Sequence, residues 1–115
     1  MGNKGSGMTP AMLAAVADQF RVLSEPTRLA LVQLLMAGER SVGELAQASG
    51  LSQASASKHL ALLAEAGFLA RRKEATTVYY SIADEVVHRL CELMCERVSH
   101  RAEADAAALK SPRRR

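Results

Sequence analysis

The sequence contains few aromatic residues, no tryptophan and only two cysteines. Aromatic residues make up 3% of the chain and hydrophobic residues 49%, so the core must be built from aliphatic side chains. Side chains such as Leu, Ala and Met favour helices over a large sheet, which predicts a mainly α-helical domain. With 115 residues the chain can form one modest core but not two, and so small a core favours dimerisation.

The scarcity of cysteine and of long apolar runs also restricts where the protein works. Cys91 and Cys95 cannot form the disulfide framework of a small secreted domain, and we expect them to be reduced thiols. No stretch approaches the ~20 apolar residues of a membrane-spanning helix, and residues 1–12 lack the apolar run of a secretory signal. These absences predict a cytoplasmic protein without a membrane segment.

The residue patterns that catalysis requires are missing as well. The sequence has no phosphate-binding glycine loop, no paired catalytic carboxylates and no set of nucleophile, base and orienting group. We therefore expect that the protein is not an enzyme. Its formal net charge is only +3, so an anionic partner would have to be recognised by a local group of basic residues.

Start and stop signals predict two helices in the first third of the chain. Thr9 and Pro10 form a typical helix start, and the apolar periodicity that follows ends near Ser24. Pro26 begins a second helix that continues toward Gly38. Because this second helix is apolar around most of its circumference, we expect it to be central and buried.

Two short helices joined by a tight turn are predicted next. Ser41 and Glu44 form a capping box for the first of them, and Gly50 ends it. Ser52 caps the second short helix, which continues until Gly67. This arrangement is typical of a helix-turn-helix motif.

The last part of the chain combines a hairpin with a long helix. Residues 68–82 change to strand-like periodicity, with a polar and partly basic stretch between two apolar segments, and Asp84 then caps a long helix. The predicted organisation is a flexible lead at 1–8, one domain at 9–108 and a basic disordered tail at 109–115.

The order of these elements, with the segments LSEPTRLALVQLL, GLSQASASKHLALLAEAGFL and VYYSI, resembles the ArsR/SmtB family of transcriptional regulators. The resemblance covers about residues 16–100. It implies a dimeric winged helix-turn-helix repressor, mainly α with a small β-hairpin, that releases its double-stranded DNA operator when a metal, metalloid or other signal arrives.

The sequence departs from that family in two places. Ala75 stands at the tip of the wing, where the family usually has Gly, so a turn with positive φ would be strained by roughly 1 kcal/mol. No cysteine precedes position 91, so the Cys-x-Cys metalloid site that many members carry near the recognition module is absent.

The second helix of the motif and the wing provide candidate DNA contacts. Because Ala56, Leu60 and Leu63 are expected to face inward, short polar and basic side chains should face outward and enter a major groove. Basic and hydroxyl side chains of the wing would add phosphate or minor-groove contacts. The candidates are Ser52, Gln53, Ser55, Ser57, Lys58 and His59 on the helix, and Arg71, Arg72, Lys73, Thr76 and Thr77 on the wing.

Alternatives to DNA contact stay open for this surface. The polar set could be an ordinary solvated helix face, or the winged helix could be a protein-protein adaptor, since a fold does not guarantee a function. The basic character of the face favours DNA over an adaptor role. His59, beside the inward-facing Leu60, either satisfies a local backbone group or contacts a phosphate.

The segment HRLCELMCERVSH, residues 88–100, holds both cysteines on the last helix. At 100° per residue His88, Cys91 and Cys95 share one narrow strip, from which His100 is excluded. Two thiolates with His88 or a group from a partner chain could bind one soft ion. Trivalent arsenic or antimony would fit two or three thiolates, whereas Zn²⁺ or Cd²⁺ would need four ligands and is the weaker candidate.

Three interpretations of this cysteine pair remain open. It is a binding site for a thiol-reactive inducer, a switch for oxidants or reactive sulfur species, or a pair of buried side chains at a dimer seam with no ligand. The zinc pattern that some family members carry on this helix is broken, since Val86 and Arg97 occupy its two middle positions. The predicted function is a homodimeric repressor that an inducer at Cys91 and Cys95 releases from its operator.

Overall fold

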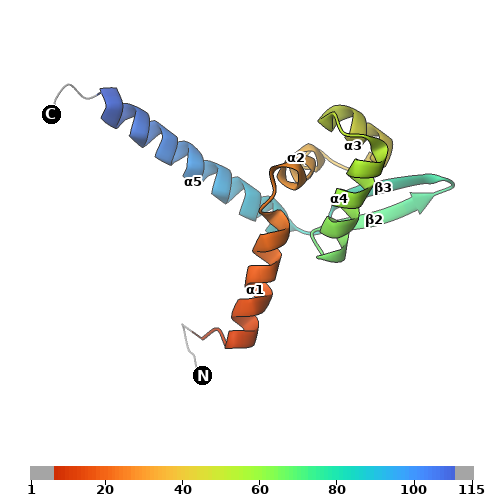
Figure 1. Ribbon diagram of the computed structural model, residues 1–115, viewed down its shortest axis with the longest axis horizontal. Coiled ribbons are helices and arrows are strands. Elements are labelled where there is room, and N and C mark those ends of the chain that lie inside the picture. The colour runs from red at the N-terminus through yellow and green to blue at the C-terminus, as the bar shows by residue number, and fades with distance from the viewer. Residues whose placement is uncertain (1–6, 111–115) are drawn as a thin grey trace. The chain divides into compact units, whose positions relative to one another are not determined.

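The computed structural model describes residues 7–110 and divides the chain into two compact units, with the boundary between Ala83 and Asp84 (Figure 1). The parts of the expected lead and basic tail at 1–6 and 111–115 lie outside the described residues.

Four helices and three strands form the first unit. They are α1 (Pro10–Leu23), α2 (Pro26–Leu35), β1 (Arg40–Ser41), α3 (Val42–Ser49), α4 (Gln53–Glu65), β2 (Leu69–Glu74) and β3 (Thr77–Ile82). The predicted order of two helices, a helix-turn-helix motif and a hairpin is confirmed. Strand β1 was not anticipated, because two residues are too few to carry a periodic signal.

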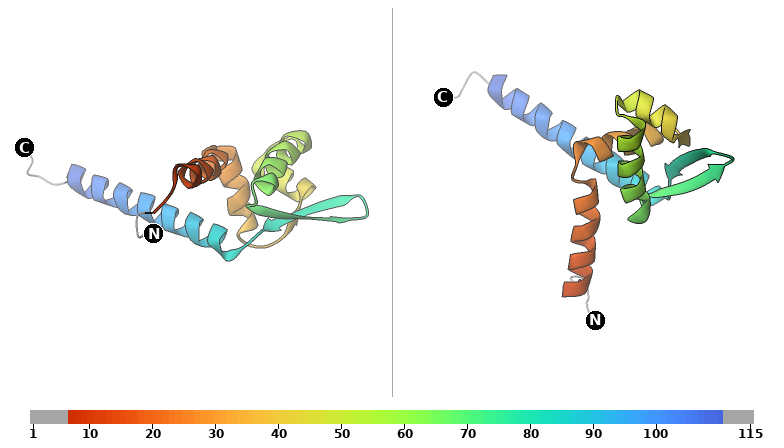
Figure 2. Two further views of the ribbon diagram at one scale, coloured as in Figure 1. Left: turned by 90° about the horizontal axis from the view of Figure 1, so that it is seen from below. Right: turned by 45° about the vertical axis from the view of Figure 1, so that its right-hand side comes forward.

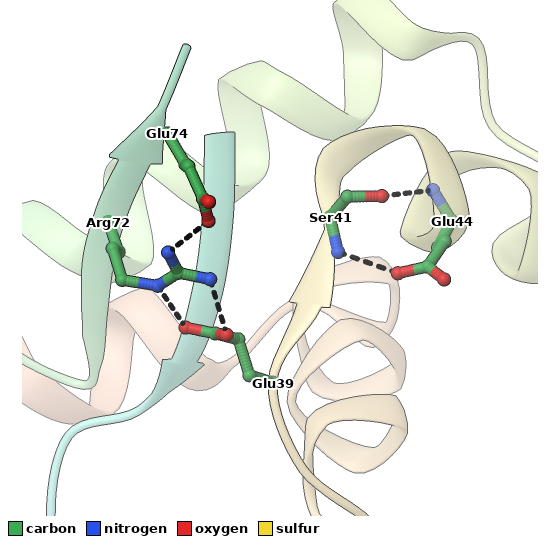
Figure 3. Close-up of polar contacts among 5 residues, drawn as sticks. All are labelled: Glu39, Ser41, Glu44, Arg72 and Glu74. Atoms are coloured by element: carbon green, nitrogen blue, oxygen red, sulfur yellow. Dashed lines mark hydrogen bonds and ion pairs between the residues drawn. The ribbon is translucent and has the colours of Figure 1, made fainter. Parts of the chain in front are cut away.

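Helix ends follow the capping residues of the sequence. Thr9 Oγ1 accepts the Met12 N–H at 3.1 Å at the start of α1. At the start of α3, Ser41 Oγ accepts the Glu44 N–H at 3.1 Å, and the Glu44 carboxylate accepts the Ser41 N–H at 2.9 Å (Figure 3). Gly50 ends α3 with φ +78°, a left-handed conformation that costs glycine little. The capping box and the glycine stop are therefore confirmed.

The core of the first unit is mainly aliphatic, as the composition predicts, and it also buries Phe68 and Tyr80. Its largest fully buried side chains are Leu31, Val32, Leu35, Leu45, Leu60 and Leu63. Three of these belong to α2, which confirms its central and buried position. Among the described residues no polar or charged side chain is buried.

The three strands form an antiparallel sheet in the order β1-β3-β2. Strand β2 continues to Glu74, so most of the polar stretch expected between the strands belongs to the hairpin itself. Only Ala75 and Thr76 form the turn, and Ala75 has φ +56°. Ala75 lies at the tip of the wing, as expected, and its turn has the positive φ that the sequence left undecided. In every view the β2–β3 hairpin projects beyond the helices of its unit (Figures 1 and 2).

The second unit is a single helix, α5 (Glu85–Lys110). Asp84 Oδ1 accepts the Val87 N–H at 3.3 Å, which confirms the predicted cap. The helix runs into the first two positions of the segment 109–115 that was expected to be disordered. Large apolar side chains of α5 are exposed, among them Leu93 and Val98, both 59% exposed. None of the helices in the described residues is long and apolar enough to cross a membrane.

Candidate nucleic-acid interface

Helix α4 is held in place by one wholly buried face. Ala56, Leu60 and Leu63 are each 0% exposed, as the sequence predicts. The turn before α4 is short, because the Leu51 N–H donates to the Ala46 carbonyl at 3.1 Å and closes α3. Helices α3 and α4 therefore pack as a compact pair, with the opposite face of α4 directed outward (Figures 1 and 2).

The N-terminal half of α4 exposes short polar side chains and one lysine. Ser52, Gln53, Ser57 and Lys58 are exposed. Ser55 was also expected to face solvent but is half-buried. Ser52 Oγ accepts the Ser55 N–H at 3.1 Å, and the positive end of the helix dipole favours an anion at this terminus. These exposed side chains and the helix N-terminus can together approach a nucleic-acid backbone.

His59 differs from its neighbours in the sequence, because it contacts another part of the protein. It is half-buried rather than solvent-facing, and Arg28 Nη1 lies 3.3 Å from its Nδ1. Arg28 Nε also donates to the Val22 carbonyl at 2.6 Å, so Arg28 bridges the end of α1 and the middle of α4. Since a guanidinium only donates, His59 Nδ1 is the acceptor in this contact.

A second link between α1 and α4 lies at the end of α4, where Gln19 Nε2 donates to the Ala66 carbonyl at 3.0 Å. Sequence reasoning missed both Gln19 and Arg28. The only signal for Arg28 was its place in the Pro-Thr-Arg start of α2, and none pointed to Gln19. These two links hold α4, which carries the exposed polar side chains, against α1.

The register of the wing separates its three consecutive basic residues. Arg71 pairs with the buried Tyr80, and Lys73 with Val78, whereas Arg72 pairs with Tyr79. Because side chains alternate along a strand, Arg71 and Lys73 share one face of the sheet and Arg72 lies on the other. The other wing candidates, Thr76 and Thr77, lie at and beside the turn and are exposed, as are Arg71 and Lys73.

Arg72 is engaged in ion pairs within the protein (Figure 3). Its Nε and Nη2 donate to the Glu39 carboxylate at 3.0 and 2.8 Å, and its Nη1 donates to Glu74 at 2.8 Å. The hydrogen bonds from Arg72 to Glu39 lower the pKa of the Glu39 carboxyl. The bonds to Glu39 and Glu74 raise the pKa of the Arg72 guanidinium. Within the described residues Arg71 and Lys73 form no ion pair. The wing thus presents two uncommitted cations on one face.

The cysteine strip of α5 supplies thiols but not a complete metal site in one chain. Both thiols are free, with His88 and Cys91 half-buried and Cys95 exposed. Burial raises the pKa of the Cys91 thiol, and the nearby Cys95 adds to this rise. Among the described residues no group of three or more His, Cys, Asp or Glu side chains could hold a metal ion. His88 is therefore not gathered with the two cysteines into a three-ligand site.

Together, the buried inner face of α4, the tight turn before it and the projecting hairpin define a winged helix-turn-helix protein. A family model described as a helix-turn-helix domain matches residues 23–72. The chain is 38% identical over 74 residues to a Streptomyces lividans protein named as a probable mercury resistance operon repressor. That match covers 64% of this chain and 59% of the relative, and a match to a second curated regulator covers 47% of that protein.

Solved structures give the same class. A homodimeric winged helix-turn-helix DNA-binding domain from Mycobacterium bovis, described as a possible ArsR-family transcriptional regulator, is 34% identical with a TM-score of 0.77. The match covers 86% of this chain and 94% of that one. The antimony-specific transcriptional repressor AntR is 28% identical over 90% of this chain and 98% of its own, with a TM-score of 0.74. The chain belongs to the ArsR/SmtB family of winged-helix transcriptional regulators, which confirms the resemblance predicted from the sequence.

Proposed function

We propose that this protein is a homodimeric repressor that binds an operator palindrome through α4 and the wing, and that a thiol-binding inducer releases it. The observation that carries the proposal is the division of α4 into two faces. Its inner face is fully buried, while its N-terminal half exposes Gln53, Ser57 and Lys58. A helix of this kind, on a basic and projecting module, fits a major groove.

Different side chains of this surface would have different roles on DNA. Gln53, with the half-buried Ser55 beside it, lies at the end of α4 that would meet base edges. Ser52, Lys58 and the N-terminus of α4 would contact phosphates, and Arg71 on the wing would add a further phosphate or minor-groove contact.

Lys58→Ala tests the docking. Loss of the Lys58 ammonium group should weaken operator binding. It should also lower the slope of log affinity against log salt by about 0.9, the value for one phosphate contact. The operator can be selected by the purified protein from a random double-stranded pool, and affinities measured by fluorescence anisotropy at several salt concentrations. Glu65→Ala, at the other end of α4, is the matched control and should leave the slope unchanged. An unchanged slope for Lys58→Ala contradicts this docking.

The dimer is proposed from two sets of exposed apolar side chains, taken separately. On α1, Met12, Leu13 and Phe20 are each about half exposed. On α5, the exposed apolar residues include Met94 and Val98. Exposed stripes of this kind usually mark an interface. A second copy of this chain is the proposed occupant, since the similar M. bovis domain is described as homodimeric.

The inducer is proposed to be a soft metal or metalloid ion held by Cys91 and Cys95. Helical neighbours four residues apart lie close together, and thiolates prefer soft ions. Relatives named for mercury resistance and for antimony support this class of ligand. A third ligand would have to come from outside the strip, for example from the partner chain. The raised pKa of Cys91 leaves less thiolate at neutral pH, which counts against a fast oxidant sensor.

The double variant Cys91→Ser with Cys95→Ser tests the inducer. It should bind the operator as tightly as the wild type but should not be released by arsenite, antimonite, Cd²⁺ or Zn²⁺, each titrated against the protein–operator complex. Hydrogen peroxide and a persulfide donor, titrated in parallel, distinguish a metal sensor from a switch for oxidants or reactive sulfur species. If every ion releases the double variant and the wild type equally, the cysteines are not the inducer site.

A further inference from the structure

Arg72 reaches across the outer face of the three-stranded sheet. The register places Arg72 of β2 opposite Tyr79 of β3, and Tyr79 opposite Ser41 of β1. The Arg72 guanidinium lies over the Tyr79 ring, 4.4 Å from its centroid. Beyond the ring it pairs with Glu39, which directly precedes β1 (Figure 3). One side chain therefore connects the outermost strand of the wing to the opposite edge of the sheet.

The hydrogen bonds of Arg72 leave it little capacity to bind DNA. A guanidinium has five N–H donors, and in Arg72 two of them form a parallel pair with Glu39 and a third binds Glu74. A phosphate approaching Arg72 would also approach both carboxylates, and like charges repel. The stacking on Tyr79 adds a cation–π attraction that a DNA contact would have to break.

The same contacts connect the wing to the helix-turn-helix motif. Glu39 is separated by Arg40 alone from Ser41, whose capping box with Glu44 starts α3 (Figure 3). A projecting two-stranded hairpin has little stability of its own. A clamp between Arg72 and Glu39 would fix the hairpin against the segment that begins α3, and so fix its angle to α4.

We propose that Arg72 is a positioning residue, which orients the wing through Glu39, Tyr79 and Glu74 and does not itself contact DNA. The wing cations that contact DNA are then Arg71 and Lys73, on the other face of the hairpin. This inference rests on the proposed function, because it concerns the same DNA-binding surface.

The variant Glu39→Gln decides between positioning and direct contact by the sign of its effect. If Arg72 binds a phosphate, removing the Glu39 charge frees the guanidinium and strengthens operator binding. If Arg72 positions the wing, Glu39→Gln weakens binding by about two- to fivefold, the range that an exposed ion pair supports. That loss would occur even though the variant makes the surface more positive. Tighter binding by Glu39→Gln overturns the proposal.

Two further variants show whether the clamp acts as a unit. Arg72→Gln should weaken binding to the same extent as Glu39→Gln, and the double variant should be no weaker than either single one. Arg72→Lys keeps the charge but cannot form the bidentate pair, so it should behave like Arg72→Gln. Additive losses, or full binding by Arg72→Lys, overturn the proposal. Nitrogen-15 relaxation of the wing amides in the free protein should show increased mobility in all of these variants.

Lys73→Gln is the matched control, because it lies next to Arg72 in the sequence and on the opposite face of the strand. It should weaken binding and reduce the salt slope by about 0.9 without changing wing mobility. If neither Lys73→Gln nor Lys58→Ala changes operator binding, the proposed DNA-binding function fails. If both weaken binding but Glu39→Gln strengthens it, only the positioning role fails.

Discussion

Helices α4 and α5 differ in how far their apolar side chains are buried. Helix α4 buries Ala56, Leu60 and Leu63 completely within its own chain. Helix α5 leaves Leu93, Met94 and Val98 between 49% and 59% exposed. The helix proposed to read DNA is therefore buried on one face within a single chain, whereas the helix that carries the cysteines leaves large apolar side chains exposed. This difference suits a regulator in which dimer packing and an inducer act on α5 while the DNA-reading surface stays intact.

The largest effect is expected from truncating the buried face of α4. Leu60→Ala should lower the free energy of unfolding by about 2–5 kcal/mol, because a fully buried leucine leaves a cavity. Leu93→Ala removes the same atoms from α5, where the side chain is 59% exposed, and should cost less. Urea denaturation at two protein concentrations checks both variants. The Leu60→Ala loss should be independent of concentration, and equal losses for the two variants would contradict the comparison.

A charge on the exposed apolar stripe of α5 should disrupt the dimer. Met94→Glu places a carboxylate where the proposed partner packs, and burying an unpaired charge is costly. We expect the dimer dissociation constant to rise at least tenfold, as about 1.4 kcal/mol produces, while the circular dichroism of the helices is retained. Analytical ultracentrifugation measures the change.

The control for this variant is His100→Glu, which adds a carboxylate on another side of α5, outside the cysteine strip. At 100° per residue His100 lies 120° from Met94 and 140° from Cys95, so this change should leave the dimer unaffected. A wild-type protein that sediments as a monomer at micromolar concentration would contradict the dimer itself.

Ion binding at the proposed inducer site should respond to pH in a definite direction. Metal ions bind thiolates, so protons compete with them, and burial raises the pKa of Cys91. Affinity for the ion should therefore rise with pH, up to about tenfold per pH unit for each proton displaced, until the raised pKa is passed. Titrations of Cd²⁺ with the free protein between pH 6.5 and pH 9 measure this slope. Cys91→Ser should flatten it, and a wild-type affinity that does not change with pH would contradict thiolate coordination.

The fold was predictable from the sequence wherever its causes are local. The capping box of Ser41 and Glu44 depends on residues three apart, and the buried face of α4 follows from helical periodicity. The place of Ala75 in the wing turn followed from the polar stretch between two strand-like segments. Each of these features needs only the chain immediately around it.

The parts that could not be predicted depend on contacts between distant segments. Arg72 meets Glu39 across 33 residues, through the register of a sheet whose first strand has only two residues. Arg28 meets His59 across 31 residues. From the sequence, Arg72 and His59 were grouped with their neighbours as DNA contacts, because periodicity places a side chain on a face but does not say which side chain faces it from elsewhere.

The smallest effect is expected at the tip of the wing. Ala75 has φ +56°, which costs a residue with a Cβ roughly 1 kcal/mol more than glycine. Ala75→Gly should relieve that strain, but glycine also gives the unfolded chain more freedom, so the net gain in stability should be about 0.5 kcal/mol or less. Thermal unfolding measures it. Because the change touches neither the buried face of α4 nor the exposed stripe of α5, dimerisation and inducer response should stay at wild-type values. A shift in either would show that the wing and α5 are coupled, so that the two helices are less independent than their burial indicates.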